Sequence, residues 1–155
     1  MKIMDFLSKK SILAELKSTK KEDVIKELVD LLISSGEVDK SSRAKVMDAL
    51  TERESLGSTA IGQGIAIPHA KTDCVGKLVG AFALSKKGVD FDSLDGEPVY
   101  IFFLLLAAQD SAGPHLKALA RISRLFKDKY FRDNLRSCAD EKAIIEVISQ
   151  EDEKI

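Results

Sequence analysis

The chain has 155 residues, of which 45% are hydrophobic and 32% are charged, and its formal net charge is −1. This composition is ordinary for a globular protein, and the length is sufficient to bury a core without metal or disulfide support. A nearly neutral chain has no overall attraction to nucleic acid or to an anionic membrane. We therefore expect a single domain, residues 1–155, that neither binds nucleic acid nor inserts into a membrane.

The N-terminus and the cysteines carry no targeting or metal signal. The first ten residues include the acidic Asp5 and no apolar run, so we expect no signal peptide. Cys74 and Cys138 lack the spacing of a CxxC motif or of a zinc site. They are expected to be buried free thiols in a reducing cytosol.

The first predicted helix begins near residue 19. Thr19 and Glu22 have the spacing of a capping box, and Gly36 is expected to end the helix. Apolar residues recur between them at helical spacing, namely Val24, Ile25, Leu28, Val29, Leu31 and Leu32.

A second helix is predicted from the next serine pair. Ser41 or Ser42 is expected to cap it, and it is expected to run to about Glu54, with Arg53 at its end and Gly57 at the exit. Its expected apolar face consists of Ala44, Met47 and Leu50.

The middle of the chain predicts strands and turns. Residues 65–67 are expected to be a short strand within a loop, and residues 77–84 the next strand. Residues 86–88 and 95–96 carry turn signals. The longest apolar run, 99–108, has about half the length of a membrane helix, and a strand buried on both faces is expected over 99–107.

Three helices are predicted in the last third, over about 114–127, 129–136 and 140–149. The expected inner side of the first is Leu116, Leu119, Ala120, Ser123 and Phe126, with Ile122 and Leu125 at the margins. Its expected outward side is Lys117, Arg121, Arg124 and Lys127. Helices that alternate with buried strands predict an α/β layered domain with a mixed sheet.

His69 is the first candidate for chemistry. It follows Pro68 and a segment that contains Gly62 and Gly64, whose backbone N–H groups can turn toward an anion. A neutral imidazole is a competent nucleophile near pH 7. The alternative is a packed core histidine behind a tight glycine turn.

His115 and Arg53 are the other candidates. His115 follows Pro114 at an expected helix start, where the dipole favours an anion and a neutral imidazole can donate to a phosphoryl oxygen. A fixed guanidinium such as that of Arg53 can bind two phosphoryl oxygens. The alternatives are a helix cap for His115 and a solvated charge for Arg53. Two histidines without further ligands predict no metal site, and Ser58 and Thr59 lack a nucleophile-elbow pattern.

The combined pattern resembles enzyme IIA of the bacterial phosphoenolpyruvate-dependent phosphotransferase system. The resemblance is to the fructose/mannitol type, which also includes a nitrogen-regulatory branch. Its signature extends from Arg53-Glu54 through Gly57-Ser-Thr59-Ala-Ile61-Gly-Gln-Gly64 to Pro68-His69-Ala70, and residues 89–96 and 115–125 also match. One departure is Ala60, where the family usually has glycine and where a methyl group would disfavour a positive φ.

The resemblance implies that His69 accepts a phosphoryl group from phospho-HPr and passes it to a IIB component for sugar uptake. It implies assistance from Arg53 and His115, and a phosphate loop that includes Thr59, Gly62 and Gly64. It also implies an αβα sandwich with a mixed, roughly five-stranded sheet, a cytoplasmic location and no metal or organic cofactor.

The resemblance leaves two functions open. The alternative to transport is a nitrogen-regulatory protein that binds target proteins according to its phosphorylation state. No fused IIB, IIC or regulator region is visible, so a standalone domain is expected. The pattern identifies neither the sugar nor the oligomeric state.

Overall fold

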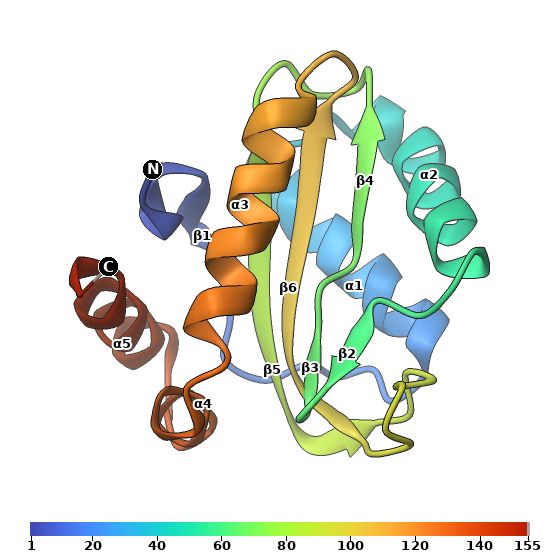
Figure 1. The fold of residues 1–155 in the computed structure, drawn as a ribbon. Coiled ribbons are helices and arrows are strands. Elements are labelled where there is room, and N and C mark those ends of the chain that lie inside the picture. Colours follow the sequence, from blue (N-terminus) through green and yellow to red (C-terminus); the bar gives the residue numbers. More distant parts are fainter. Residues whose placement is uncertain (155) are drawn as a thin grey trace.

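A central mixed β-sheet carries the fold, and helices cover both of its faces (Figure 1). The computed structural model describes residues 1–154. The strands are β1 (Leu7–Leu13), β2 (Ala60–Gly62), β3 (Ile65–Ala66), β4 (His69–Thr72), β5 (Val79–Val89) and β6 (Val99–Ala108). Their order is β1-β5-β6-β3-β2, and β4 also pairs with β6. The pairs β5–β6 and β2–β3 are antiparallel, whereas β1–β5, β3–β6 and β4–β6 are parallel.

Five α-helices flank the sheet. They are α1 (Lys21–Ser34), α2 (Arg43–Ser55), α3 (Ala112–Leu125), α4 (Lys129–Arg136) and α5 (Glu141–Glu153). Short 3₁₀ turns cover Ile3–Asp5 and Lys40–Ser42. Helices α1 and α2 pack on one face and α3, α4 and α5 on the other, as Figure 1 shows. This confirms the predicted αβα sandwich with a mixed sheet.

The sheet has six strands but is only five positions wide. Strands β3 and β4 follow one another along the same edge of β6, with Ile65 opposite Ile101 and His69 opposite Leu105. The chain between β3 and β4 also stays hydrogen-bonded to β6, because Leu105 donates its N–H to the carbonyl of Pro68 at 2.9 Å. Residues 65–72, which include the end of the sequence signature, therefore run along β6, the central strand of the fold.

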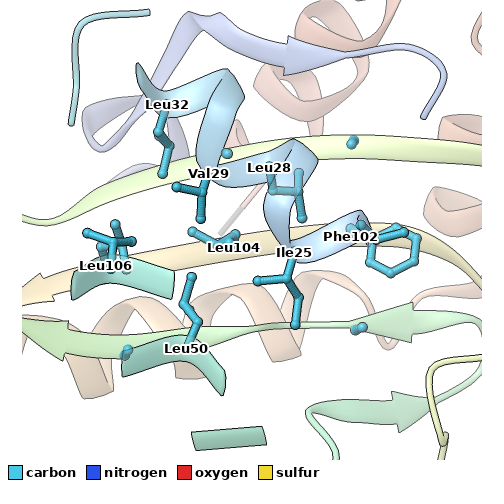
Figure 2. Close-up of a cluster of buried hydrophobic side chains, with 14 of the residues drawn as sticks. Ile25, Leu28, Val29, Leu32, Leu50, Phe102, Leu104 and Leu106 are labelled. Carbon is cyan, nitrogen blue, oxygen red and sulfur yellow. The ribbon is translucent and has the colours of Figure 1, made fainter. Parts of the chain in front are cut away.

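Strand β6 supplies both halves of the core. Between Ile101 and Leu106, its even-numbered side chains pack against α1 and α2. Figure 2 shows this for Phe102, Leu104 and Leu106 beside Ile25, Leu28, Val29, Leu32 and Leu50. Its odd-numbered side chains, Ile101, Phe103 and Leu105, pack on the opposite face with α3, α4 and α5. Side chains of a strand alternate between faces, so a strand covered on both faces is apolar throughout. The predicted buried strand over 99–107 is confirmed.

The predicted N-terminal cap of the first helix is wrong. Lys20 is the N-cap of α1 and makes no side-chain cap bond, so the capping box of Thr19 and Glu22 does not form. Ser42 is the N-cap residue of α2, as predicted, but its side chain makes no cap bond. Ala44 is exposed, and Val46 takes its place on the buried face of α2. Gly36 does end the first helix region, with a φ of 83°.

The predicted inner face of the third helix is correct for Leu119 and Phe126, which pack in the core, but wrong for Leu116 and Ala120, which are exposed. Its buried residues are His115, Ala118, Ile122 and Leu125, whereas the Leu116 side chain is 66% exposed. Apolar residues occupy all of this helix except the side of Lys117, Arg121 and Arg124, so their spacing alone did not select which part of that wide apolar surface is buried. Arg121 points partly inward because Asp152 of α5 accepts a hydrogen bond from its Nε at 2.8 Å.

Two features of the sheet differ from expectation. Strand β1 was not predicted, since its charged Lys9 and Lys10 interrupt the apolar pattern and the pairing with β5 shifts between Leu7 and Ile12. Residues 86–88 are not a chain reversal but part of β5, where the register shifts and Gly88 has a φ of 84°.

The helices predicted near 129–136 and 140–149 are confirmed, the last extending to Glu153. Within residues 1–154, no helix combines the length and apolar character needed to cross a membrane.

Truncation of the centre of β6 tests this packing. Leu104 is fully buried on the α1 face, so Leu104→Ala should lower the free energy of unfolding by about 2–5 kcal/mol. The matched control is Leu94→Ala, because the Leu94 side chain is 78% exposed. Chemical denaturation measures both variants. A change below about 1 kcal/mol for Leu104→Ala would contradict a tightly packed core on this face.

Candidate functional site

His69 is the first residue of β4, and its half-buried side chain lies on the face covered by α3. Its Nδ1 lies 2.7 Å from the carbonyl oxygen of Ile67. A carbonyl oxygen can only accept, so Nδ1 carries the proton in the neutral ring and donates to Ile67. The lone pair is then on Nε2. The local backbone thus selects which nitrogen of His69 can act as a nucleophile.

His115 lies directly beside His69. It is in the first turn of α3, which begins just after β6 ends (Figure 1), and it is 6% exposed. The two imidazole rings are edge to face, with centroids 5.4 Å apart. Among the described residues, His115 Nε2 is the buried side-chain nitrogen without a hydrogen-bond partner. Such a nitrogen costs free energy unless another group binds it, so it is available to a group carried by His69.

Burial lowers the pKa of both imidazoles below the ordinary value. Loss of hydration is the largest cause of the lowered pKa of His69, and the charge of Arg53 lowers it further. The Ile67 carbonyl and the charge of Glu54 oppose these effects without reversing them. For His115, burial again comes first among the causes of a lowered pKa, followed by the charges of His69 and Lys71. Both rings are therefore neutral at pH 7.

Arg53 and Glu54 reach the site from the end of α2, which packs beside β4. Arg53 donates from Nη1 to the carbonyl of Gly57 at 2.8 Å. Its charge acts on His69, so the guanidinium lies in the same electrostatic environment. Thr59 is buried, and its hydroxyl and backbone N–H both donate to the carboxylate of Glu54.

The two glycines of the expected phosphate loop do not meet His69. Gly62 and Gly64, with φ values of 103° and 79°, form the tight turn between β2 and β3. The N–H of Gln63 between them points to Asp95, whose Oδ2 it reaches at 2.9 Å. This turn and His69 are separated by four residues along β6, or about 13 Å at the rise of a strand. The structure therefore gives these glycines a role in chain reversal.

Ala60 is compatible with the loop. It lies in β2 opposite Ala66 and is fully buried. Its φ is not positive, so its methyl group meets no backbone conflict. The departure from the family pattern therefore leaves the site geometry intact.

Three contributors to the site were missed from the sequence. Lys71 shares the face of His69 because it is two residues further along the strand, a spacing that strand alternation could have revealed. Glu54 is adjacent to Arg53 but was considered only as part of a motif. The Ile67 carbonyl gives no signal in the sequence, because backbone groups are present at every residue.

The arrangement combines a nucleophilic nitrogen, a neighbouring imidazole and a guanidinium. The first can form a bond to phosphorus, and the other two can donate hydrogen bonds to phosphoryl oxygens. Over residues 1–154, no three His, Cys, Asp or Glu side chains are grouped so that they could hold a metal ion.

Comparisons with known proteins agree on one family. Residues 5–151 match the family described as phosphoenolpyruvate-dependent sugar phosphotransferase system, EIIA 2. The chain is 42% identical over 152 residues to the PTS system fructose-specific EIIABC component of Bacillus subtilis, an alignment that covers 98% of the chain but 24% of that longer protein. It is 40% identical over 149 residues to the nitrogen regulatory protein of Bradyrhizobium diazoefficiens, covering 96% of the chain and 95% of the relative.

Solved structures give the same fold. The nitrogen regulatory protein IIA-Ntr from Neisseria meningitidis has a TM-score of 0.85 at 32% identity, and the match covers 94% of this chain and 98% of that one. The IIA mannitol protein from Escherichia coli has a TM-score of 0.76 at 21% identity, with 90% and 96% covered, which supports the fold alone.

Titration of the two imidazoles tests the electrostatics of the site. Both should titrate below about pH 6.5, and Arg53→Ala should raise the pKa of His69 because it removes a neighbouring positive charge. Arg43→Ala, at the other end of α2, is the matched control and should leave that pKa unchanged. NMR of the ring nitrogens against pH provides the measurement.

The same shifts predict how stability depends on pH. Where the folded pKa is lowered, the unfolded chain binds more protons, so stability falls as the pH drops below about 6.5. A His69 pKa above that of a free imidazole would contradict the burial of this site.

Proposed function

The chain belongs to the EIIA 2 family of the phosphoenolpyruvate-dependent sugar phosphotransferase system, and on this basis we propose that it is a phosphocarrier that holds a phosphoryl group on His69. One observation carries the proposal. The Nδ1 of His69 is committed to a backbone carbonyl, and its Nε2 is left as a nucleophile next to a second, unpartnered imidazole. We propose that residues 1–155 act as one domain in this role.

The proposed reaction is a transfer between two imidazoles. The lone pair on Nε2 of His69 forms a bond to the phosphorus of phospho-HPr, and the phosphorus–nitrogen bond of HPr breaks, returning its electron pair to the HPr imidazole. A protonated His69 has no lone pair to offer, so its lowered pKa favours the reactive form. After transfer, the positive charge that develops on the ring is stabilised by the Ile67 carbonyl at Nδ1.

Arg53 and His115 are proposed to bind the transferring group. The charge on the phosphoryl oxygens is spread over several atoms, and a guanidinium can donate to two of them at once. His115 supplies a hydrogen bond from the first turn of α3, where the helix dipole also favours negative charge. Transfer of this kind relies on positioning and charge stabilisation and is proposed to need no bound metal or organic cofactor.

Two fates of the phosphoryl group are consistent with the family. We propose transfer to a IIB component of a sugar transporter in the cytoplasm, by similarity to the fructose-specific relative. The second candidate is regulation, in which phosphorylation decides which target protein the chain binds. It is favoured by the nitrogen regulatory relative, which aligns over 95% of its own length.

His69 should be the phosphorylated residue. Incubation with enzyme I, HPr and labelled phosphoenolpyruvate should place an acid-labile label on His69, bound to Nε2, and His69→Ala should take up none. Peptide mapping and phosphorus NMR provide the readouts. Full labelling of His69→Ala would refute the assignment. Onward transfer of label to IIB proteins then distinguishes transport from regulation, since a purely regulatory protein retains its label.

His115 should assist transfer without accepting the phosphoryl group. Loss of one charge-assisted hydrogen bond costs about 1.5–3 kcal/mol, so His115→Ala should slow single-turnover transfer from phospho-HPr roughly ten- to hundredfold. Leu116→Ala is the matched control, because its exposed side chain is the next residue of the same turn. If His115→Ala transfers at the wild-type rate, His115 has no role in transfer and only packs at the start of α3.

A further inference from the structure

Glu54 is a buried carboxylate that joins three segments around the candidate site. Its side chain is 7% exposed. One carboxylate oxygen accepts from the Thr59 hydroxyl, and the other lies 3.2 Å from the Thr59 backbone nitrogen and 2.9 Å from Lys21 Nζ. A buried carboxylate persists only when it is paired and hydrogen-bonded. Glu54 and Thr59 therefore form a clamp that closes residues 54–59 into a ring.

The ring contains the acceptor that holds Arg53. Within it, the Gly57 carbonyl accepts from Arg53 Nη1 at 2.8 Å. Gly57 itself is exposed, and apart from its chain neighbours no described atom lies within 4 Å of the place where a side chain would begin. Its backbone is held from both sides. Its own N–H donates to the Glu54 carbonyl at 3.1 Å, and the next residues are anchored by Ser58, whose hydroxyl donates to the Phe91 carbonyl at 2.8 Å, and by Thr59 on the Glu54 carboxylate.

A second branch leads from the same clamp to His69. The carbonyl of Thr59 accepts from the N–H of Ile67 at 3.0 Å. The carbonyl of Ile67 then accepts from His69 Nδ1 at 2.7 Å. Hydrogen bonds on both sides of Thr59 and of Ile67 thus link the Glu54 carboxylate, through the backbone of these two residues, to the imidazole of His69.

We propose that Glu54, acting through Thr59, is the positioning residue that holds both Arg53 and His69 in register for phosphoryl transfer. The inference rests on the proposed function of His69. It goes further because Glu54 touches no reacting atom and acts only through the groups that it holds. The competing explanation is that Glu54 merely ties the end of α2 to the start of α1 through Lys21.

A double-mutant cycle separates these explanations. Thr59→Val removes the hydroxyl at nearly constant volume, leaves the Glu54–Lys21 pair in place, and should slow transfer from phospho-HPr roughly tenfold. Thr59→Ser retains the hydroxyl and should restore most of the rate. In an Arg53→Ala background, the additional loss from Thr59→Val should shrink to at most about threefold, because the group being positioned is absent.

A second measurement tests the hydrogen bonds that lead from Thr59 to His69 and needs no phosphoryl donor. Exchange of the His69 Nδ1 proton with solvent, followed by NMR, should be several times faster in Thr59→Val and unchanged in Thr59→Ser. Glu54→Gln keeps an acceptor for the hydroxyl and provides a second variant if Thr59→Val does not fold, and it should show smaller losses in the same direction. Glu52→Gln, an exposed residue on the same helix, is the control and should match the wild type.

The outcomes are distinguishable from failure of the proposed function. If the wild type takes no phosphoryl group, the proposed function fails, and proton exchange at His69 still reports on the clamp. If the wild type is labelled but Thr59→Val and Glu54→Gln retain wild-type transfer and exchange rates, the positioning role is refuted. A lowered melting temperature with unchanged rates would assign Glu54 to the α1–α2 connection alone.

Discussion

The burial of β6 on both faces is the constraint on which the rest of the structure depends. Between Ile101 and Leu106, its even-numbered side chains hold α1 and α2, and its odd-numbered side chains hold the layer of α3, α4 and α5. Because β4 pairs in parallel with the same strand, His69 is fixed opposite Leu105, and the chain that leaves the end of β6 begins α3 with His115 beside it. Removal of apolar surface from water thus places two polar side chains from distant parts of the sequence within ring contact.

The site depends on a balance between burial and charge. Burial lowers the pKa of His69 and so favours its neutral form, and the charge of Arg53 adds to that effect. In the proposed function the same guanidinium binds phosphoryl oxygens. The charge of Glu54 opposes that of Arg53 at His69, and the Glu54 carboxylate is bound by Thr59 and Lys21. The carboxylate next in sequence to Arg53 is therefore already bound by donors from other segments. Three donors, namely the Thr59 hydroxyl, the Thr59 N–H and Lys21 Nζ, offset the cost of burying this carboxylate.

Local sequence patterns predicted the helices and strands whose apolar spacing is clear. They failed where contacts with distant parts of the chain determine the structure. The apolar run of β6 and the short helix α4 were recognised because burial on all sides or clear spacing leaves little choice. The buried face of α3 was misjudged because Leu116 has the same apolar character as the residues that pack, and only the position of β6 decides which side is covered. Strand β1 was missed because Lys9 and Lys10 lie in a bulged segment whose pairing with β5 is a long-range event.

The sequence by itself determined the candidate chemistry: His69, His115 and Arg53 were identified from residue types, spacing and family resemblance, as was the layered α/β fold. Only the tertiary structure decided which of the candidate residues meet. It brought His115 to His69, left Gly62 and Gly64 about four strand residues away, and linked Glu54 to His69 through the Thr59 and Ile67 backbone. The reason is physical: residue identity sets what a group can do, whereas strand register and buried hydrogen bonds, which join residues far apart in the chain, set where it does so.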